Sequence, residues 1–123
     1  MGIVNGTTNY ILTKMFEENM SFEAALAKAT ELGYAEADPT ADVEGLDAGR
    51  KAAILSSIAF HSRVQFKDVY TEGITKITAE DIAYAKEFDC VIKLLAVAHN
   101  TDKGIEVGVY PVLLGKEHPL SSV

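Results

Sequence analysis

Two apolar segments near the C-terminus, residues 91–98 and 105–109, limit the choice of fold. The first is almost continuously apolar, as in a buried strand, and the second alternates apolar residues with polar or small ones. Residues 100–104 between them read Asn-Thr-Asp-Lys-Gly, which is typical of a turn. We therefore expect two antiparallel strands, and we expect Pro111 to restrict the second strand to an edge or to mark a bend.

Helical periodicity precedes these strands. Helices are expected from the turn at residues 5–8 to about Asn19, after Ser21, from residue 43 to about 61, and from Thr78 to about Phe88, with one short strand within residues 69–74. In the second helix, one face carries an apolar stripe that we assign to the core: Phe22, Ala25, Leu26, Ala29 and Leu32. This order predicts an α+β fold, with helices packed on one face of an incomplete mixed or antiparallel sheet.

Composition bounds the function. A chain of 123 residues suffices for one domain with a core, residues 1–123. A net charge of −7 argues against sequence-independent binding of nucleic acid, which needs lysine and arginine to neutralise phosphates. Cys90 is the only cysteine, which fits a reducing, cytoplasmic setting, and the longest apolar run is too short to cross a membrane.

Residues 33–51 concentrate the charge, with five carboxylates and two cations. Gly33 suits the position just beyond a helix end. Pro39 disfavours helical backbone at the residue before it, so the segment through Thr40 is expected to be a loop. Asp42 then suits the N-cap of the third helix.

The charges on the third helix allow two interpretations. At about 100° per residue, Asp47 and Lys51 share one arc with Ile54 and Ile58, which we expect to mark the core side. In the first interpretation, the pair is a simple ion pair one turn apart near the helix start. Alternatively, it lines a polar cleft into which Glu36 points from the loop, where desolvation and charge would perturb pKa values.

A cation site is the main rival use of these acids. An EF-hand loop needs acids at alternating positions, and Pro39 and Val43 occupy early positions of that pattern. His61, His99 and His118 show no ligand spacing. We therefore expect no metal.

Two motifs lie in the first half of the chain: Gly2-Ile3-Val4-Asn5-Gly6-Thr7-Thr8-Asn9-Tyr10-Ile11-Leu12 and Ala29-x-x-x-Gly33-Tyr34-Ala35-Glu36-Ala37-Asp38-Pro39-x-x-Asp42-Val43-x-Gly45-x-Asp47-x-x-x-Lys51. Together they resemble homoserine dehydrogenase. They occur in the family's order and cover roughly the first 60 residues.

The resemblance implies an oxidoreductase. Homoserine dehydrogenase interconverts aspartate semialdehyde and homoserine with NADPH or NADH, in the biosynthesis of threonine, methionine and isoleucine. By position, Lys51 matches the proton donor, and Glu36 and Asp47 match the residues that hold the substrate's amino end. Asp42 falls on another acidic position of the motif, to which we assign the orientation of Lys51.

The same resemblance implies cofactor contacts. Gly33 matches a backbone contact near the nicotinamide, and the turn of Asn5, Gly6 and Thr7 matches the nicotinamide end of the cleft. No segment reads G-x-G-x-x-G, so the resemblance implies that NADP or NAD is bound mainly by a nucleotide-binding domain outside this sequence.

We therefore expect residues 1–123 to be part of the substrate-binding and catalytic domain, inactive alone and homodimeric in its parent. The resemblance places the dimer contact on the two C-terminal strands. Two other functions remain open at this stage: a non-catalytic module that binds amino acids in the same cleft, and a dimerisation module.

Overall fold

The computed structural model describes all 123 residues. Its elements are α1 (Gly6–Glu18), α2 (Phe22–Glu31), α3 (Thr40–Val43), α4 (Leu46–Ala59), η1 (Phe66–Asp68), β1 (Tyr70–Thr71), α5 (Ala79–Glu87), β2 (Cys90–Thr101), β3 (Gly104–Gly115) and η2 (Pro119–Ser122). None of the helices combines the length and the apolar composition needed to cross a lipid bilayer.

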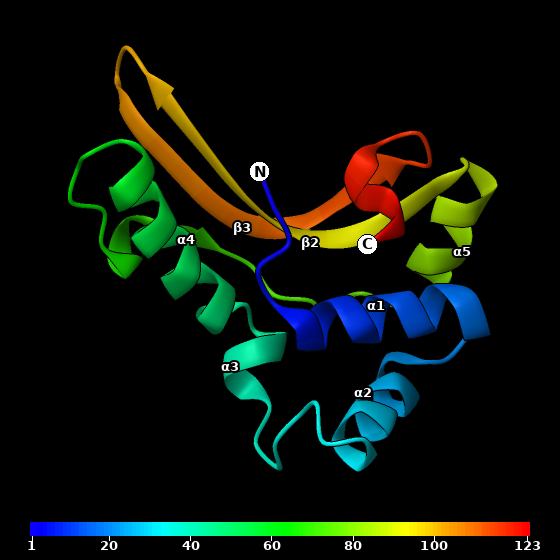
Figure 1. Cartoon of the computed structure of the whole chain (residues 1–123). Helices are drawn as coiled ribbons and strands as arrows, with labels where there is room; N and C mark the ends of the chain where they lie inside the picture. The colour runs from blue at the N-terminus through cyan, green and yellow to red at the C-terminus, as the bar shows by residue number, and fades with distance from the viewer.

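A long hairpin of β2 and β3 forms most of the sheet. The two strands pair antiparallel from Cys90 opposite Gly115 to Thr101 opposite Gly104, and the short β1 pairs parallel to β3, giving the order β1-β3-β2. The hairpin arches over α1, α4 and α5, which lie on one side of it, while η2 lies on the other (Figure 1). The expected α+β fold, with helices on one face of an incomplete mixed sheet, is confirmed.

The core lies between the sheet and these helices. From α1, Ile11, Leu12 and Met15 are almost completely buried because their spacing places them on one face of the helix. They join an 18-residue cluster that includes Val109 of the central strand. A second cluster of four residues, around Leu95, packs near η2. The two clusters fix α1 against the hairpin.

The helix ends follow their sequence signals. Asn5 and Ser21 cap α1 and α2, and Thr78 forms a capping box with Asp81 at the start of α5. At the end of α2, Gly33 has a φ of +83°, and the N–H of Tyr34 donates to the carbonyl of Ala29 at 2.8 Å. The expected C-terminal glycine is therefore confirmed.

The third expected helix is wrong at its start. Asp42 is not an N-cap, because it lies inside the short helix α3, and Gly45, with a φ of +82°, separates α3 from α4. The N–H of Ile74 donates to the carbonyl of Val43 at 2.8 Å. That carbonyl would accept from Asp47 in a continuous helix, so a distant segment stabilises the break.

The expected core face of this helix is also wrong. Ile54 and Ile58 are 61% and 68% exposed. The buried side of α4 is formed instead by small residues, including Ala48, Ala52 and Ala53, which let the helix lie close to the sheet. Asp47 and Lys51 share the open arc and do not point into the core. At the C-cap of α2, Leu32 is likewise exposed, whereas Ala25 and Ala29 within the helix are buried as expected.

The strands are longer than expected, and their apolar residues are mostly buried within the chain itself. Expected residues 69–74 contain only the two-residue strand β1. Pro111 lies in the central strand, opposite Leu94 of β2 and past the last residue of β3 that β1 pairs. Pro111 therefore faces a paired strand on the side of β2. On the side of β1 it lies at a free edge of β3, as expected for proline.

Candidate active site

A polar pocket of about 520 Å³ lies where the N-termini of α1 and α4 meet α3. It draws on segments far apart in the sequence, and most of its lining is polar. The lining residues are Asn5, Gly6, Thr7, Tyr10, Tyr34, Asp42, Asp47 and Lys51. Six of the eight predicted site residues line this pocket together: Asn5, Gly6, Thr7, Asp42, Asp47 and Lys51.

The start of α1 presents unpaired backbone donors to this pocket. Asn5 accepts from the N–H of Thr8 at 2.8 Å, whereas the N–H groups of Gly6 and Thr7 have no partner within the chain. A side chain added at Gly6 would meet nothing within 4 Å, so a ligand has room to approach the backbone there. Such a helix start favours an anion or a polar ligand.

Two carboxylates converge on the side chain of Asn5. Its Nδ2 donates to Oδ1 of Asp42 at 2.8 Å and to Oδ2 of Asp47 at 2.9 Å. Asp42 comes from α3 and Asp47 from the first turn of α4, so the amide joins three helices. The pocket floor is therefore built from residues whose relative positions the amide fixes.

Lys51 lies beside these acids. Its Nζ is 2.9 Å from Oδ2 of Asp47 and donates to the carbonyl of Val4 at 3.1 Å, and its side chain is 49% exposed. The pKa of Asp47 is lowered, first by the hydrogen bond from Lys51 and then by that from Asn5, against the opposing effect of burial. The ion pair of the first interpretation is therefore present, and it lines a polar pocket as in the second, but Glu36 is not part of the lining.

The remaining predicted residues lie outside the pocket lining. Glu36 is exposed in the loop after α2 and has no hydrogen-bond or ion-pair partner. Gly33 ends α2 one residue before the lining residue Tyr34. No hydrogen bond or ion pair joins Asp42 to Lys51, and the two are linked through Asn5 and Asp47.

Two aromatic residues of the pocket were not predicted from the sequence as site residues. The rings of Tyr10 and Tyr34 lie 5.0 Å apart at an angle of 55°, and Thr7 Oγ1 donates to the carbonyl of Tyr34 at 2.8 Å. Tyr10 follows Gly6 by four residues, so the helical period already places it on the same face. Tyr34 gave no such signal, because its position depends on how the loop after α2 folds back.

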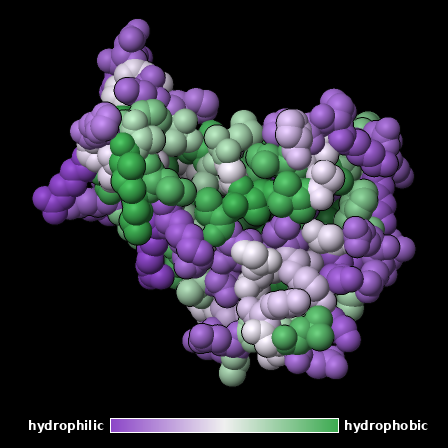
Figure 2. Space-filling view, viewed as in Figure 1, coloured by the Kyte–Doolittle hydropathy of each residue, from purple (hydrophilic) through white to green (hydrophobic).

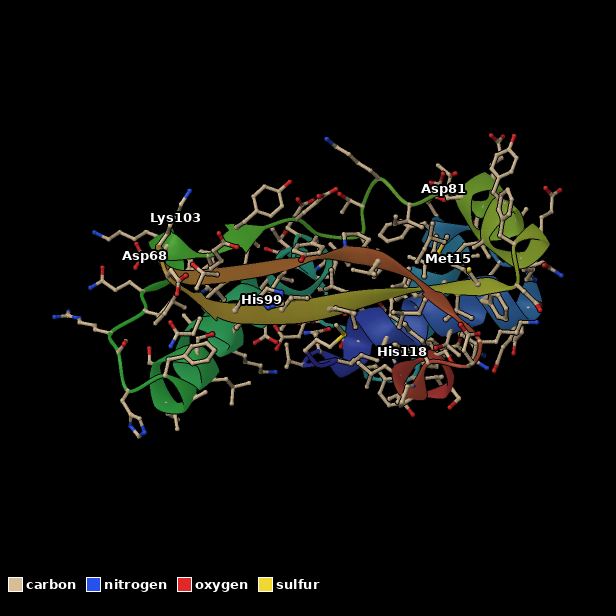
Figure 3. All side chains as sticks on the ribbon, turned by 90° about the horizontal axis from the view of Figure 1, so that it is seen from above. Met15, Asp68, Asp81, His99, Lys103 and His118 are labelled. Carbon is tan, nitrogen blue, oxygen red and sulfur yellow. The ribbon has the colours of Figure 1, made fainter.

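Other titratable residues do not form a second centre. His99 lies on β2, His118 near η2, Asp68 near the hairpin turn and Asp81 on α5, all well separated (Figure 3). No three His, Cys, Asp or Glu side chains are grouped as a metal ion would require. The pocket beside Lys51 is therefore the best candidate for chemistry, with a cation, two carboxylates and free backbone donors.

Comparisons with known proteins agree with this architecture. The homoserine dehydrogenase family model matches residues 1–123. Homoserine dehydrogenase of Bacillus subtilis (strain 168) is 53% identical over 123 residues, which cover 100% of this chain and 28% of the relative. A crystal structure of the S. aureus enzyme at pH 7.5 has a TM-score of 0.96 and 43% identity, covering 98% of this chain and 30% of that one. A hyperthermophilic archaeal homoserine dehydrogenase mutant in complex with NADPH has a TM-score of 0.73 and 29% identity, covering 96% and 32%.

The fold thus matches one domain of homoserine dehydrogenases of known structure. The chain belongs to the homoserine dehydrogenase family. It spans about 28–29% of the length of the curated relatives it matches.

Proposed function

We propose that this chain supplies the substrate-binding and proton-donating part of an NAD(P)-dependent homoserine dehydrogenase, which interconverts aspartate semialdehyde and homoserine. The observation that carries the proposal is the position of Lys51. Its ammonium lies at an open pocket, held by Asp47 and by the carbonyl of Val4, with two carboxylates nearby. A substrate with an aldehyde and an ammonium group needs both kinds of charge.

Lys51 acts as the general acid. Bound NADPH or NADH supplies the hydride that reduces the aldehyde carbon. The carbonyl oxygen then needs a proton, which Lys51 Nζ donates to give the alcohol. Because the Lys51 side chain is 49% exposed, solvent can return the proton to the amine afterwards.

The carboxylates hold the substrate's ammonium. Asp42 and Asp47 line the pocket, and each retains one oxygen without a hydrogen bond or ion pair from the protein. Glu36 is the third carboxylate of this group. Because Glu36 lies outside the pocket lining, the loop after α2 must move Glu36 towards the pocket when substrate binds. Asp47 has a second role, because it orients Lys51 at 2.9 Å.

The residues also suit one end of a dinucleotide. The free N–H groups of Gly6 and Thr7 are suitable donors for a polar group of the nicotinamide end, and Gly33 ends α2 beside Tyr34. A three-stranded sheet without a G-x-G-x-x-G segment offers no site for the rest of the cofactor. NADP or NAD is therefore bound mainly by another domain of the complete enzyme.

The proposal extends to the setting of the enzyme. We infer a cytoplasmic enzyme of threonine, methionine and isoleucine biosynthesis that acts as a homodimer. Large apolar residues remain exposed, including Ile54, Ile58 and Leu113, and Figure 2 shows apolar surface in the region of α4 and of the hairpin. This exposure supports an association with further protein surface. Light scattering of the complete enzyme tests the dimer, and a stable monomer at high concentration would end that part of the proposal.

A chimera tests the catalytic role directly. The 123 matched residues of the B. subtilis enzyme are replaced by this chain, and NADPH oxidation is measured with aspartate semialdehyde. Lys51→Met should lower kcat by roughly 10²–10⁴-fold, the usual contribution of general acid catalysis. Lys28→Met is the matched control, because Lys28 pairs with Glu31 on α2, outside the pocket lining. A near-normal kcat in the Lys51→Met chimera would refute the assignment.

The chain alone supplies a second test. Because it offers no complete cofactor site, the purified 123-residue chain should not oxidise NADPH in the presence of aspartate semialdehyde. Aldehyde-dependent oxidation by the chain alone would show that the whole reaction site is present within it.

A further inference from the structure

The side chain of Asn5 has no hydrogen-bonding capacity left for a ligand. Its Oδ1 accepts from the N–H of Thr8 at 2.8 Å and from Thr8 Oγ1 at 3.0 Å. Its Nδ2 donates both hydrogens, to Asp42 and Asp47. Asn5 is also only 6% exposed. A buried amide with all four bonds made is a structural element of the site rather than a contact for substrate or cofactor.

The orientation of this amide is not arbitrary. The backbone N–H of Thr8 can only donate, so Oδ1 must face it. Both carboxylates can only accept when ionised, so Nδ2 must face Asp42 and Asp47. Exchange of the amide oxygen and nitrogen would leave donors facing donors and acceptors facing acceptors.

In each of the two carboxylates, one oxygen is bound by the Asn5 amide and the other is left free. Asn5 binds Oδ1 of Asp42 and Oδ2 of Asp47, and the ammonium of Lys51 binds that same Oδ2. Oδ2 of Asp42 and Oδ1 of Asp47 receive no hydrogen bond or ion pair from the protein. Each acid therefore presents one fixed oxygen and one free oxygen.

Charge repulsion makes such a link necessary. Asp42 and Asp47 come from different helices, and two carboxylates that share a small region repel one another. The two N–H groups of Asn5 offset that repulsion on one side, and Lys51 does so on the other. Without the amide, the pKa of Asp47 would rise or one of the two carboxylates would turn away.

We infer that Asn5 is a positioning residue, which holds Asp42 and Asp47 as a pair and, through Asp47, fixes the ammonium of Lys51. This inference rests on the proposed function only where it concerns catalysis. It differs from the contact that the family resemblance suggested for Asn5, because the amide acts on the two acids and not on the cofactor. The free carboxylate oxygens remain for the ammonium of the ligand.

Two variants separate this role from helix capping. Asn5→Ser keeps a side-chain oxygen that can cap α1 but removes both amide donors. Asn5→Asp keeps the shape and the acceptor and places a third carboxylate against the other two. Ser21→Ala is the matched control, because it removes the cap of α2, where the Ser21 hydroxyl accepts from Ala24, away from the pocket.

The first measurement is independent of any reaction. The side-chain carboxyl carbon of Asp47 is followed by ¹³C NMR during a pH titration of the 123-residue chain. Because the hydrogen bond from Asn5 helps to lower the pKa of Asp47, the titration midpoint of Asp47 should rise in Asn5→Ser and Asn5→Asp, whereas Ser21→Ala should leave it unchanged. An unchanged midpoint in the Asn5 variants, or an equal rise in Ser21→Ala, would overturn the inference.

The second measurement uses the chimera with the B. subtilis enzyme. Asn5→Ser should lower kcat by up to about 100-fold, as expected when catalytic groups shift by about 1 Å, and should move the acidic limb of the kcat/KM profile to higher pH. Ser21→Ala should leave the profile unchanged. An active Asn5→Ser chimera with an unchanged pH profile of kcat/KM would contradict the inference. An unmodified chimera without activity would instead count against the proposed function, and the NMR titration would still decide the role of Asn5.

Discussion

The approach of Gly73 to the junction of α3 and α4 should be essential for the pocket. A methyl carbon placed on Gly73 would lie 2.5 Å from the Cα and the carbonyl carbon of Glu44, and nearer still to the carbonyl oxygen of Val43. Carbon atoms in contact are separated by about 3.5–4.0 Å, so the backbone would have to move by roughly 1 Å. These neighbours are backbone atoms, which cannot turn aside as a side chain does.

The stability cost follows from this geometry. Overpacking typically costs about 1–3 kcal/mol, and weakening the hydrogen bond from Ile74 to Val43 adds about 1 kcal/mol. Gly73→Ala should therefore lower the free energy of unfolding by about 2–4 kcal/mol in urea titrations followed by circular dichroism. Gly2→Ala is the matched control, because a side chain there meets nothing within 4 Å.

The Gly73→Ala substitution should also lower catalytic activity. Val43 and Glu44 connect Asp42 to the start of α4, so a shift of the junction separates the two acids. In the chimera, Gly73→Ala should reduce kcat by about 100-fold, the usual effect of a 1 Å misplacement. If Gly73→Ala were as stable and as active as Gly2→Ala, the close packing at this junction would be refuted.

Three further predictions concern a helix cap, two apolar side chains and one carboxylate. Thr78→Ala should cost about 1 kcal/mol in urea unfolding because it removes the cap of α5, and Thr78→Ser should restore most of that loss. Ile58→Ala should cost less than about 0.5 kcal/mol because Ile58 is 68% exposed, whereas Leu12→Ala, at a site that is 1% exposed, should cost about 2–5 kcal/mol. The pKa of Asp47 is lower in the folded chain, so its contribution to stability is present above the unfolded pKa and is lost as the pH falls through the folded pKa. Unfolding free energies from pH 6 to pH 2 should therefore fall less steeply in Asp47→Asn than in the unaltered chain, and identical slopes would contradict this.

The local features of this protein follow from its amino-acid sequence. The caps at Asn5, Ser21 and Thr78, the glycine after α2 and the hairpin all arise from interactions between residues close in the chain. The ion pair of Asp47 and Lys51 is also local, because residues four apart in a helix are neighbours. The two motifs near the N-terminus were sufficient to indicate the family.

The arrangement of the helices around the pocket depends on contacts between residues far apart in the sequence. The break before α4 depends on the hydrogen bond from the N–H of Ile74 to the carbonyl of Val43. A bond between residues 31 positions apart cannot be predicted from a local sequence pattern. The core face of α4 was predicted from its isoleucines, but the sheet lies against its alanines, because small side chains allow the closest packing. Asn5 reaches Asp42 and Asp47 across 37 and 42 residues, so the site exists only after α1, α3 and α4 have been brought together by burial of their apolar faces.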